Sequence, residues 1–228
     1  MTNAAAGNKA FYETTSTEGR CGYRDIADHP ASLAAIERTL RRHMSQSLRG
    51  ARWLDVGCGL GWLADVAERN GMSFDGIDVS ETNVAACRAR RRGVFHLGDF
   101  TTASLGPSYD LVSFISTLHH FDDWRAAVDR AMALLRPGGL LYVEHEPTPW
   151  YAHFYRRWLT LSDPDWRELY AVEVHWLQRP SIRPEELPEG VVEYHADFVP
   201  VVRRARIAGP SRRLQRVMPS YRKLMRAT

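Results

Sequence analysis

The chain has 228 residues, 44% of them hydrophobic and 25% charged, and a formal net charge of +3. These values are ordinary for a soluble globular protein, and no run of 18 apolar residues or apolar signal-peptide core is present. Its three cysteines, Cys21, Cys58 and Cys87, are far apart and odd in number, which argues against a disulfide framework and against a zinc site. We therefore expect one cytosolic α/β domain with reduced thiols.

The first predicted element is an amphipathic helix. Leu33, Ile36, Leu40, Met44 and Leu48 recur at steps of three and four residues, which predicts a helix over 31–48 that packs beside a sheet. We treat residues 1–50 as an N-terminal helical cap on a core that spans 51–146.

A strand and a glycine turn follow at residues 53–61 (WLDVGCGLG). The spacing of Gly57, Gly59 and Gly61 lets backbone approach a nucleotide-like ligand closely. The third glycine comes early, and Trp62 stands where dinucleotide-binding loops have glycine, which favours a ligand without a pyrophosphate and disfavours a nicotinamide oxidoreductase. A second apolar run, 74–79, leads to Asp78, which is placed to accept hydrogen bonds from ribose hydroxyls.

The next predicted elements are helices and strands in alternation. A helix follows Gly61 and ends at the pair Asn70 and Gly71, and Ser80 is a helix cap. Strands are predicted at 94–97, 111–115 and 140–143, with a helix over 124–135 and a turn at 137–139. Such alternation predicts a doubly wound parallel sheet whose ligand binds beyond the carboxyl ends of the strands.

The segment after residue 146 differs in composition. Aromatic residues crowd into 150–176, and we interpret 147–190 as a lid over the substrate or as helices packed on the core. Residues 191–194 and 199–207 predict a closing antiparallel hairpin within 191–208. Nine basic and no acidic residues follow from position 203. The basic tail, 209–228, is expected to pack on the protein's own surface or on a dimer partner; an anionic membrane or RNA phosphates are the alternatives.

Five motifs, in order and spacing, resemble those of class I S-adenosylmethionine-dependent methyltransferases: DVGCGLG (55–61), GIDVS (76–80), GDF (98–100), YDLVSFISTLHHFD (109–122) and LRPGGLLYV (135–143). The resemblance implies a Rossmann-like, mostly parallel seven-stranded sheet and S-adenosylmethionine as cofactor. It also implies roles: Asp55 orders the glycine loop and the amino-acid end of the cofactor, Asp78 binds the ribose, Asp99 accepts from the adenine amino group, and Phe100 packs on the ring. The expected cofactor site comprises Asp55, Gly57, Cys58, Gly59, Gly61, Asp78, Val79, Asp99, Phe100 and Ser116.

Polar residues at the last two strand ends are the candidates for catalysis. His119 or His120 is predicted to be the general base, the alternative being that they only shape the pocket, and His145 is a third candidate. Glu144 and Glu146 could hold an amine, a hydroxyl or a cation; without a metalloenzyme spacing we expect no metal. Expected substrate contacts are Glu144, Glu146, Trp150, His153, Phe154 and His175.

Together these features predict a methyltransferase for a small aromatic or apolar molecule, acting on oxygen or nitrogen, with secondary metabolism as a plausible setting. The alternatives are an RNA or membrane-lipid methyltransferase that uses the basic tail, and a non-catalytic scaffold of the same fold. No separate nucleic-acid-binding domain is visible, so a nucleic-acid substrate is not expected. A homodimer is compatible with the sequence.

Overall fold

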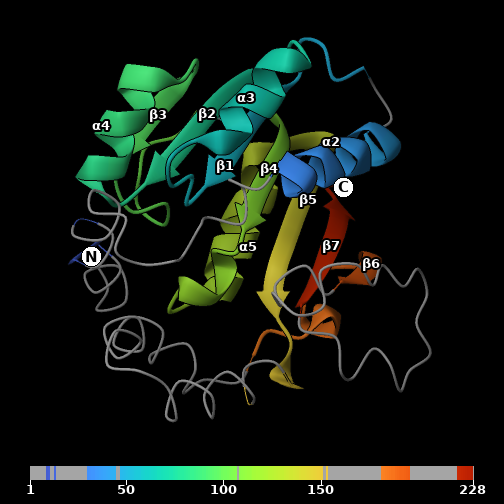
Figure 1. Ribbon diagram of the computed structural model, residues 1–228. Coiled ribbons are helices and arrows are strands. Elements are labelled where there is room, and N and C mark those ends of the chain that lie inside the picture. Colours follow the sequence, from blue (N-terminus) through green and yellow to red (C-terminus); the bar gives the residue numbers. More distant parts are fainter. Residues whose placement is uncertain are drawn as a thin grey trace.

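The computed structural model describes residues 9–10, 13, 30–44, 47–106, 108–150, 153, 181–195 and 220–227. Within them the chain forms a seven-stranded sheet in the order β3-β2-β1-β4-β5-β7-β6 (Figure 1). The strands are β1 Arg52–Val56, β2 Ser73–Asp78, β3 Val94–Leu97, β4 Tyr109–Ile115, β5 Leu135–Pro147, β6 Gly190–His195 and β7 Ser220–Arg226. The strands β1 to β5 pair in parallel, and β7 runs antiparallel to both β5 and β6. The predicted doubly wound, mostly parallel seven-stranded sheet is confirmed.

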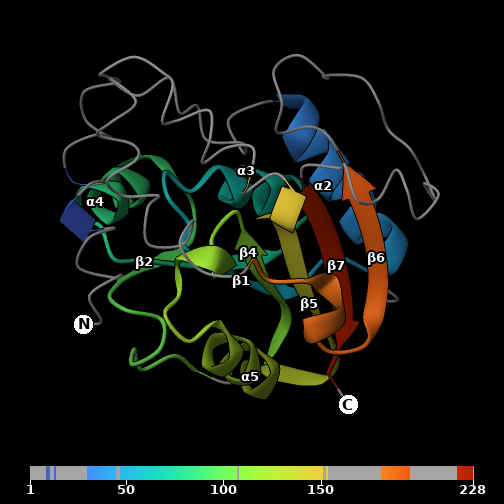
Figure 2. The same cartoon turned by 90° about the horizontal axis from the view of Figure 1, so that it is seen from below.

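Helices cover both faces of this sheet. They are α2 Pro30–His43, α3 Trp62–Arg69, α4 Glu81–Arg90 and α5 Trp124–Leu134, with the short 3-10 helices η2 Leu118–His120 and η3 Pro184–Glu186. The view from below shows α2, α3 and α4 on one face and α5 on the other (Figure 2). Each face has its own buried apolar cluster: Leu40, Trp53 and Tyr142 lie on the first side, and Val112, Ala131 and Val143 lie on the second.

Several local signals work as expected. The Ser80 hydroxyl accepts a hydrogen bond from the Asn83 amide at 3.2 Å and caps α4. Asn70 ends α3, and Gly71 follows with a left-handed φ of 67°. The first helix, however, ends at His43 rather than at the predicted residue 48. Leu48 is still buried, because the turn that precedes β1 carries it into the core.

The last strand, β7, lies in the segment that was predicted to be a basic tail. β6 pairs with residues 220–226, and its predicted partner, 199–207, lies outside the described residues. The end of the predicted basic tail is therefore an interior strand of the sheet. This segment was predicted to be a tail because of its basic residues, but each of the three in β7 has a partner inside the chain. Arg222 pairs with Glu144. Lys223 donates to the carbonyls of Pro184 and Leu187, and Arg226 donates to those of Gly138 and His43.

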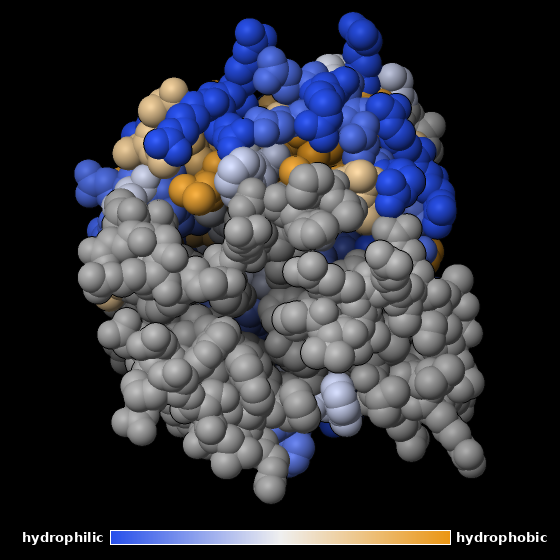
Figure 3. Space-filling view, viewed as in Figure 1, coloured by the Kyte–Doolittle hydropathy of each residue, from blue (hydrophilic) through white to orange (hydrophobic). Residues whose placement is uncertain are grey.

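Hydrophilic side chains dominate the described surface above α2 and α3, with smaller apolar areas between them (Figure 3). Among the residues that the structure describes, no helix combines the length and the apolar character needed to cross a bilayer.

Candidate active site

Backbone hydrogen bonds join the carboxyl ends of the parallel strands in two pairs, β1 with β2 and β4 with β5. The amides of Gly57 and Cys58, just after β1, donate to the Ile77 carbonyl of β2 at 2.8 and 3.1 Å. The Ser116 amide, just after β4, donates to the Glu144 carbonyl of β5 at 2.8 Å. The motifs that the sequence spreads over 90 positions thus meet at one edge of the sheet, where open α/β sheets bind their ligands.

The glycine loop after β1 has a backbone that only glycine adopts without strain. Gly57, Gly59 and Gly61 have φ values of 71°, 51° and 70°. A Cβ at Gly57 would lie 2.3 Å from Cγ2 of Thr117, and one at Gly61 would lie 2.9 Å from Sγ of Cys87. Gly61 is also the residue before α3, so the loop runs directly into a helix N-terminus.

Cys58 fills the space beneath this loop. Its side chain is buried, and a Cβ on Gly76 of β2 would lie 2.8 Å from its Sγ. A hydrogen bond with Cys87, together with burial, raises the pKa of the Cys58 thiol well above its ordinary value. The thiol is therefore neutral, and its position is that of a small packing residue.

Asp78 connects the glycine loop to the start of α4. Its Oδ2 accepts the Gly59 amide at 2.9 Å, and its Oδ1 accepts the Ser80 amide at 2.8 Å. Burial raises the pKa of this carboxyl, and the hydrogen bonds from the Ser80 and Gly59 amides act in the opposite direction. Asp78, which is predicted to bind the ribose, therefore also stabilises the conformation of the glycine loop.

Asp55 takes part in a buried chain of hydrogen bonds that the sequence did not reveal. The indole Nε1 of Trp53 donates to Oγ of Ser113 at 2.7 Å, and this hydroxyl donates to Oδ1 of Asp55 at 2.6 Å. The parallel pairing of β1 with β4 sets Asp55 directly beside Ser113. A serine between apolar residues in an otherwise buried strand was the signal that could have identified it.

The expected adenine contacts are placed differently from one another. Asp99 is partly exposed after β3, and its Oδ1 accepts the amide and the hydroxyl of Thr101 at 2.9 and 2.7 Å. Phe100 is 3% exposed and packs edge-on against Phe114 and Phe121 in the core. The Phe100 ring therefore packs mainly against other side chains of the core. Val79, next to Asp78, is partly exposed.

The end of β4 presents a strained residue and then a histidine pair. Ser116 has a left-handed φ of 54°, which a non-glycine residue adopts only where its surroundings impose it. The following η2 carries His119 and His120, whose ring centroids are 4.3 Å apart. Both side chains are largely buried, and η2 follows closely after the carboxyl end of β4.

A single carboxylate holds the start of η2 and one of its histidines. Oε1 of Glu146 accepts the Leu118 amide at 3.0 Å, and Oε2 lies 3.0 Å from Nδ1 of His119. Glu146 is 0% exposed. Because a carboxylate oxygen only accepts, Nδ1 of His119 is the donor in this contact, and in the neutral imidazole the lone pair then lies on Nε2.

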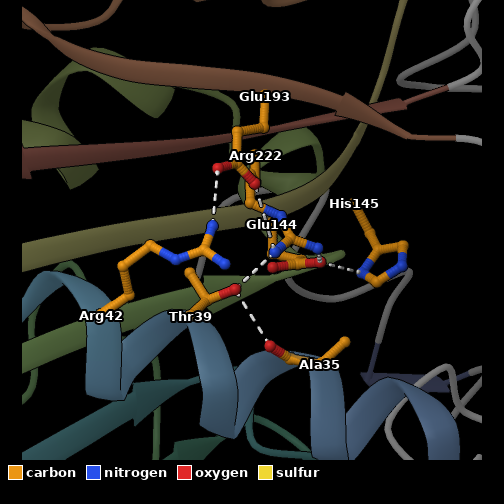
Figure 4. A network of polar contacts seen from close by, with 7 residues as sticks. All are labelled: Ala35, Thr39, Arg42, Glu144, His145, Glu193 and Arg222. Atoms are coloured by element: carbon orange, nitrogen blue, oxygen red, sulfur yellow. Dashed lines mark hydrogen bonds and ion pairs between the residues drawn. The ribbon is translucent and has the colours of Figure 1, made fainter. Parts of the chain in front are cut away.

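His145 and Glu144 precede Glu146 and have different surroundings. Burial, and then the positive charge of Arg222, lower the pKa of His145 to about 3. Its Nδ1 lies 3.6 Å from Oε1 of Glu144, but a neutral imidazole makes this a polar contact rather than an ion pair. Glu144 instead pairs with Arg222 of β7, at 2.8 Å (Figure 4).

The remaining predicted substrate residues are less well placed by the structure. Trp150 is 43% exposed, and His153 is exposed within a helix. Phe154 and His175 lie outside the described residues. Within the part of the chain that is described, no group of three or more histidine, cysteine or acidic residues is arranged to hold a metal ion.

Comparisons with known proteins agree with this geometry. A family model described as a methyltransferase domain matches residues 28–182. A ubiquinone biosynthesis O-methyltransferase of Rhodopseudomonas palustris (strain BisA53) is 30% identical over 140 residues, which are 56% of this chain and 55% of the relative. The corresponding protein of Sinorhizobium fredii is 33% identical over 104 residues, 43% of this chain and 42% of the relative. The chain spans about half the length of the curated relatives it matches.

Solved structures show the same fold. The plantazolicin methyltransferase BpumL, in complex with S-adenosylhomocysteine, has a TM-score of 0.67 at 11% identity and covers 99% of this chain and 95% of its own. Magnesium protoporphyrin IX methyltransferase from Synechocystis PCC 6803, also with S-adenosylhomocysteine bound, has a TM-score of 0.56 at 16% identity and covers 76% of this chain and 89% of its own. At these identities the likeness concerns the fold alone.

Proposed function

The chain belongs to the class I S-adenosylmethionine-dependent methyltransferase family, and we propose that it methylates an oxygen atom of a small molecule. The observation that carries the proposal is the contact between His119 and Glu146 at the shared edge of β4 and β5. An imidazole held by a buried carboxylate is suited to take the proton from a hydroxyl group. The curated relatives are named O-methyltransferases, which favours oxygen over nitrogen as the acceptor.

The residues present fit the cofactor of this family. The three left-handed glycines leave the loop without side chains where Cβ atoms would collide or be strained. Asp78 accepts backbone hydrogen bonds from Gly59 and Ser80 and a third from the Asn83 side chain. Since each carboxylate oxygen accepts up to two, an acceptor position remains for a ribose hydroxyl. Oγ of Ser116 is buried and makes no hydrogen bond with the described residues, so a bound molecule can use it. When bound, S-adenosylmethionine supplies the electrophilic methyl group.

The protein's own part in the reaction is to orient the acceptor and remove its proton. Glu146 accepts the Nδ1 proton of His119 and thereby leaves Nε2 as the basic atom. Nε2 takes the proton of the acceptor hydroxyl, and the carboxylate stabilises the imidazolium that results. Because both side chains are buried, water competes little for this proton.

A small aromatic or apolar acceptor is favoured over a polyanion. Trp150 lies just after the end of β5, is 43% exposed and offers an apolar surface there. An RNA or anionic lipid would need basic residues, but Arg222, Lys223 and Arg226 all donate within the chain. In the part of the predicted basic tail that the structure describes, Arg222 and Lys223 are also buried, which supports this preference.

Turnover with purified protein tests the proposal. S-adenosylhomocysteine release would be followed over a panel of small phenols and other hydroxyl compounds, for the wild type and for His119→Ala. We expect His119→Ala to lower kcat by about 10² to 10⁴ with the affinity for S-adenosylhomocysteine unchanged. His96→Gln, on β3 away from the proposed base, is the matched control and should retain full activity.

Two results would count against the proposal, in different ways. Tight S-adenosylhomocysteine binding without turnover of any acceptor would favour a non-catalytic scaffold. Full turnover in His119→Ala would leave a methyltransferase but remove His119 as its base.

A further inference from the structure

The end of β5 carries two acidic side chains that face opposite sides of the sheet. Leu140 and Tyr142 belong to the cluster under α2, whereas Leu141 and Val143 belong to the cluster on the α5 side. Regular alternation would place Glu144 and Glu146 together with Leu140 and Tyr142. Glu144 does face α2, but Glu146 contacts η2, whose Leu118 is part of the α5-side cluster.

A β-bulge causes this reversal. In the pairing of β5 with β7, Val143 lies opposite Lys223 and Glu146 lies opposite Tyr221. Two residues of β5, Glu144 and His145, therefore stand against the single residue Arg222 of β7. His145 has a left-handed φ of 59°, which turns the chain and re-aims the next side chain.

Arg222 is bound firmly at this bulge (Figure 4). Its Nη2 donates to Oε1 of Glu144 at 2.8 Å, and its Nη1 donates to Oγ1 of Thr39 at 2.5 Å. Thr39 in turn donates to the Ala35 carbonyl of α2 at 2.9 Å. Glu193 of β6 lies 3.6 Å from Nη1. The guanidinium thus links the bulge to α2 and to the neighbouring strand.

We propose that Arg222 is a positioning residue, which by binding Glu144 fixes the bulge so that Glu146 faces η2 and orients His119. The catalytic meaning of this inference rests on the proposed function, whereas its structural part does not. The pair is needed because Glu144 is 1% exposed, and a buried carboxylate without its cation is costly. Without Arg222, His145 would return to an extended conformation, and Glu146 would turn toward α2 and lose His119.

The tautomer and the pKa of His119 should depend on the conformation of the bulge, and both can be measured without turnover. Nitrogen-15 NMR of the full chain, labelled at histidine, gives the tautomer and the pKa of each imidazole. Among the described residues, the titratable groups against His119 are the carboxylate of Glu146 and the ring of His120. In the wild type we expect the Nδ1-protonated tautomer, and Glu146→Gln should lower the pKa of His119, because a nearby carboxylate favours the imidazolium.

Arg222→Met should reproduce the effect of Glu146→Gln on His119. We expect its tautomer signal to be lost and its pKa to fall by about one unit, and we expect kcat to fall by about 10- to 100-fold, as for other residues that orient an imidazole through a second group. The KM for S-adenosylmethionine should stay unchanged. Arg222→Lys keeps the positive charge and should restore part of the wild-type tautomer signal and pKa of His119. Arg42 contacts Glu193 rather than Glu144, so Arg42→Met is the control and should leave His119 as in the wild type.

The outcomes separate the two proposals. An unchanged tautomer and pKa of His119 in Arg222→Met overturn the inference, whatever happens to activity. A wild type that shows the expected NMR signals but methylates no acceptor overturns the proposed function and leaves the positioning role intact. If Arg222→Met does not fold, Glu144→Gln removes the negative charge that pairs with Arg222. A His119 shifted as in Glu146→Gln then supports the inference, and an unshifted one refutes it.

Discussion

Replacing Gly57 by alanine tests how closely the glycine loop is packed. Gly57 has a φ of 71°, and the left-handed conformation costs a non-glycine residue about 1 to 2 kcal/mol. The new Cβ would also lie 2.3 Å from Cγ2, 2.8 Å from Oγ1 and 3.1 Å from Cβ of Thr117. Because three atoms of this β-branched side chain are involved, a change of rotamer does not remove the collision, and overpacking adds about 1 to 3 kcal/mol.

Gly50 provides the matched control. Its φ of 82° is also left-handed, but nothing lies within 4 Å of an added Cβ. Gly50→Ala should therefore lower the free energy of unfolding by the conformational cost alone, about 1 to 2 kcal/mol. Urea denaturation would measure both variants, and titration with S-adenosylhomocysteine should show a loss of affinity for Gly57→Ala only, since Gly50 precedes β1 at the opposite end of that strand.

A double-mutant cycle isolates the collision from the backbone term. Thr117→Ala removes the methyl and hydroxyl groups that Gly57→Ala would strike, so the two changes together should be less destabilising than their sum by about 1 to 3 kcal/mol. Additive effects, or a Gly57→Ala variant no less stable than Gly50→Ala, would show that Thr117 does not close the loop.

Three further predictions concern buried polar groups. Asp78→Ala removes acceptors for the Gly59 and Ser80 amides and should weaken S-adenosylhomocysteine binding by about a hundredfold in calorimetry; equal affinities would exclude its ribose role. Ser113→Ala removes a partner of the Trp53 indole and should cost about 1 to 3 kcal/mol in urea unfolding, and a neutral substitution would contradict the buried chain. His145 has a folded-state pKa of about 3, below its unfolded value of 6.5, so stability is full above pH 6.5 and is lost as pH falls toward 3. Between pH 7 and pH 5 the wild type should lose about 2 kcal/mol more than His145→Asn, and parallel losses would refute the buried neutral imidazole.

Most of the sheet could be predicted from local pattern. Alternating apolar runs, the caps at Ser80 and Asn70, and the acids at the strand ends lie where these signals indicate. The exception is β7, which was interpreted as a basic tail. The charges of Arg222 and Lys223 concealed a buried strand, because their partners come from positions 36 or more residues away in the sequence. Composition alone contains no information on such pairings.

The site shows a second limit of pattern reasoning. Both Glu144 and Glu146 were expected to contact substrate because they end the same strand, and the alternation rule would give them one face of the sheet. The structure separates them, because one left-handed residue, His145, lies between them. A histidine in that conformation leaves no signal in the sequence, unlike the glycines at 57, 59 and 61. Glu144 is then an internal partner of Arg222, and only Glu146 reaches His119. The two acids differ in function because the bulge changes the face of the second, so a variant that removes the bulge should affect the base while leaving the glycine loop intact.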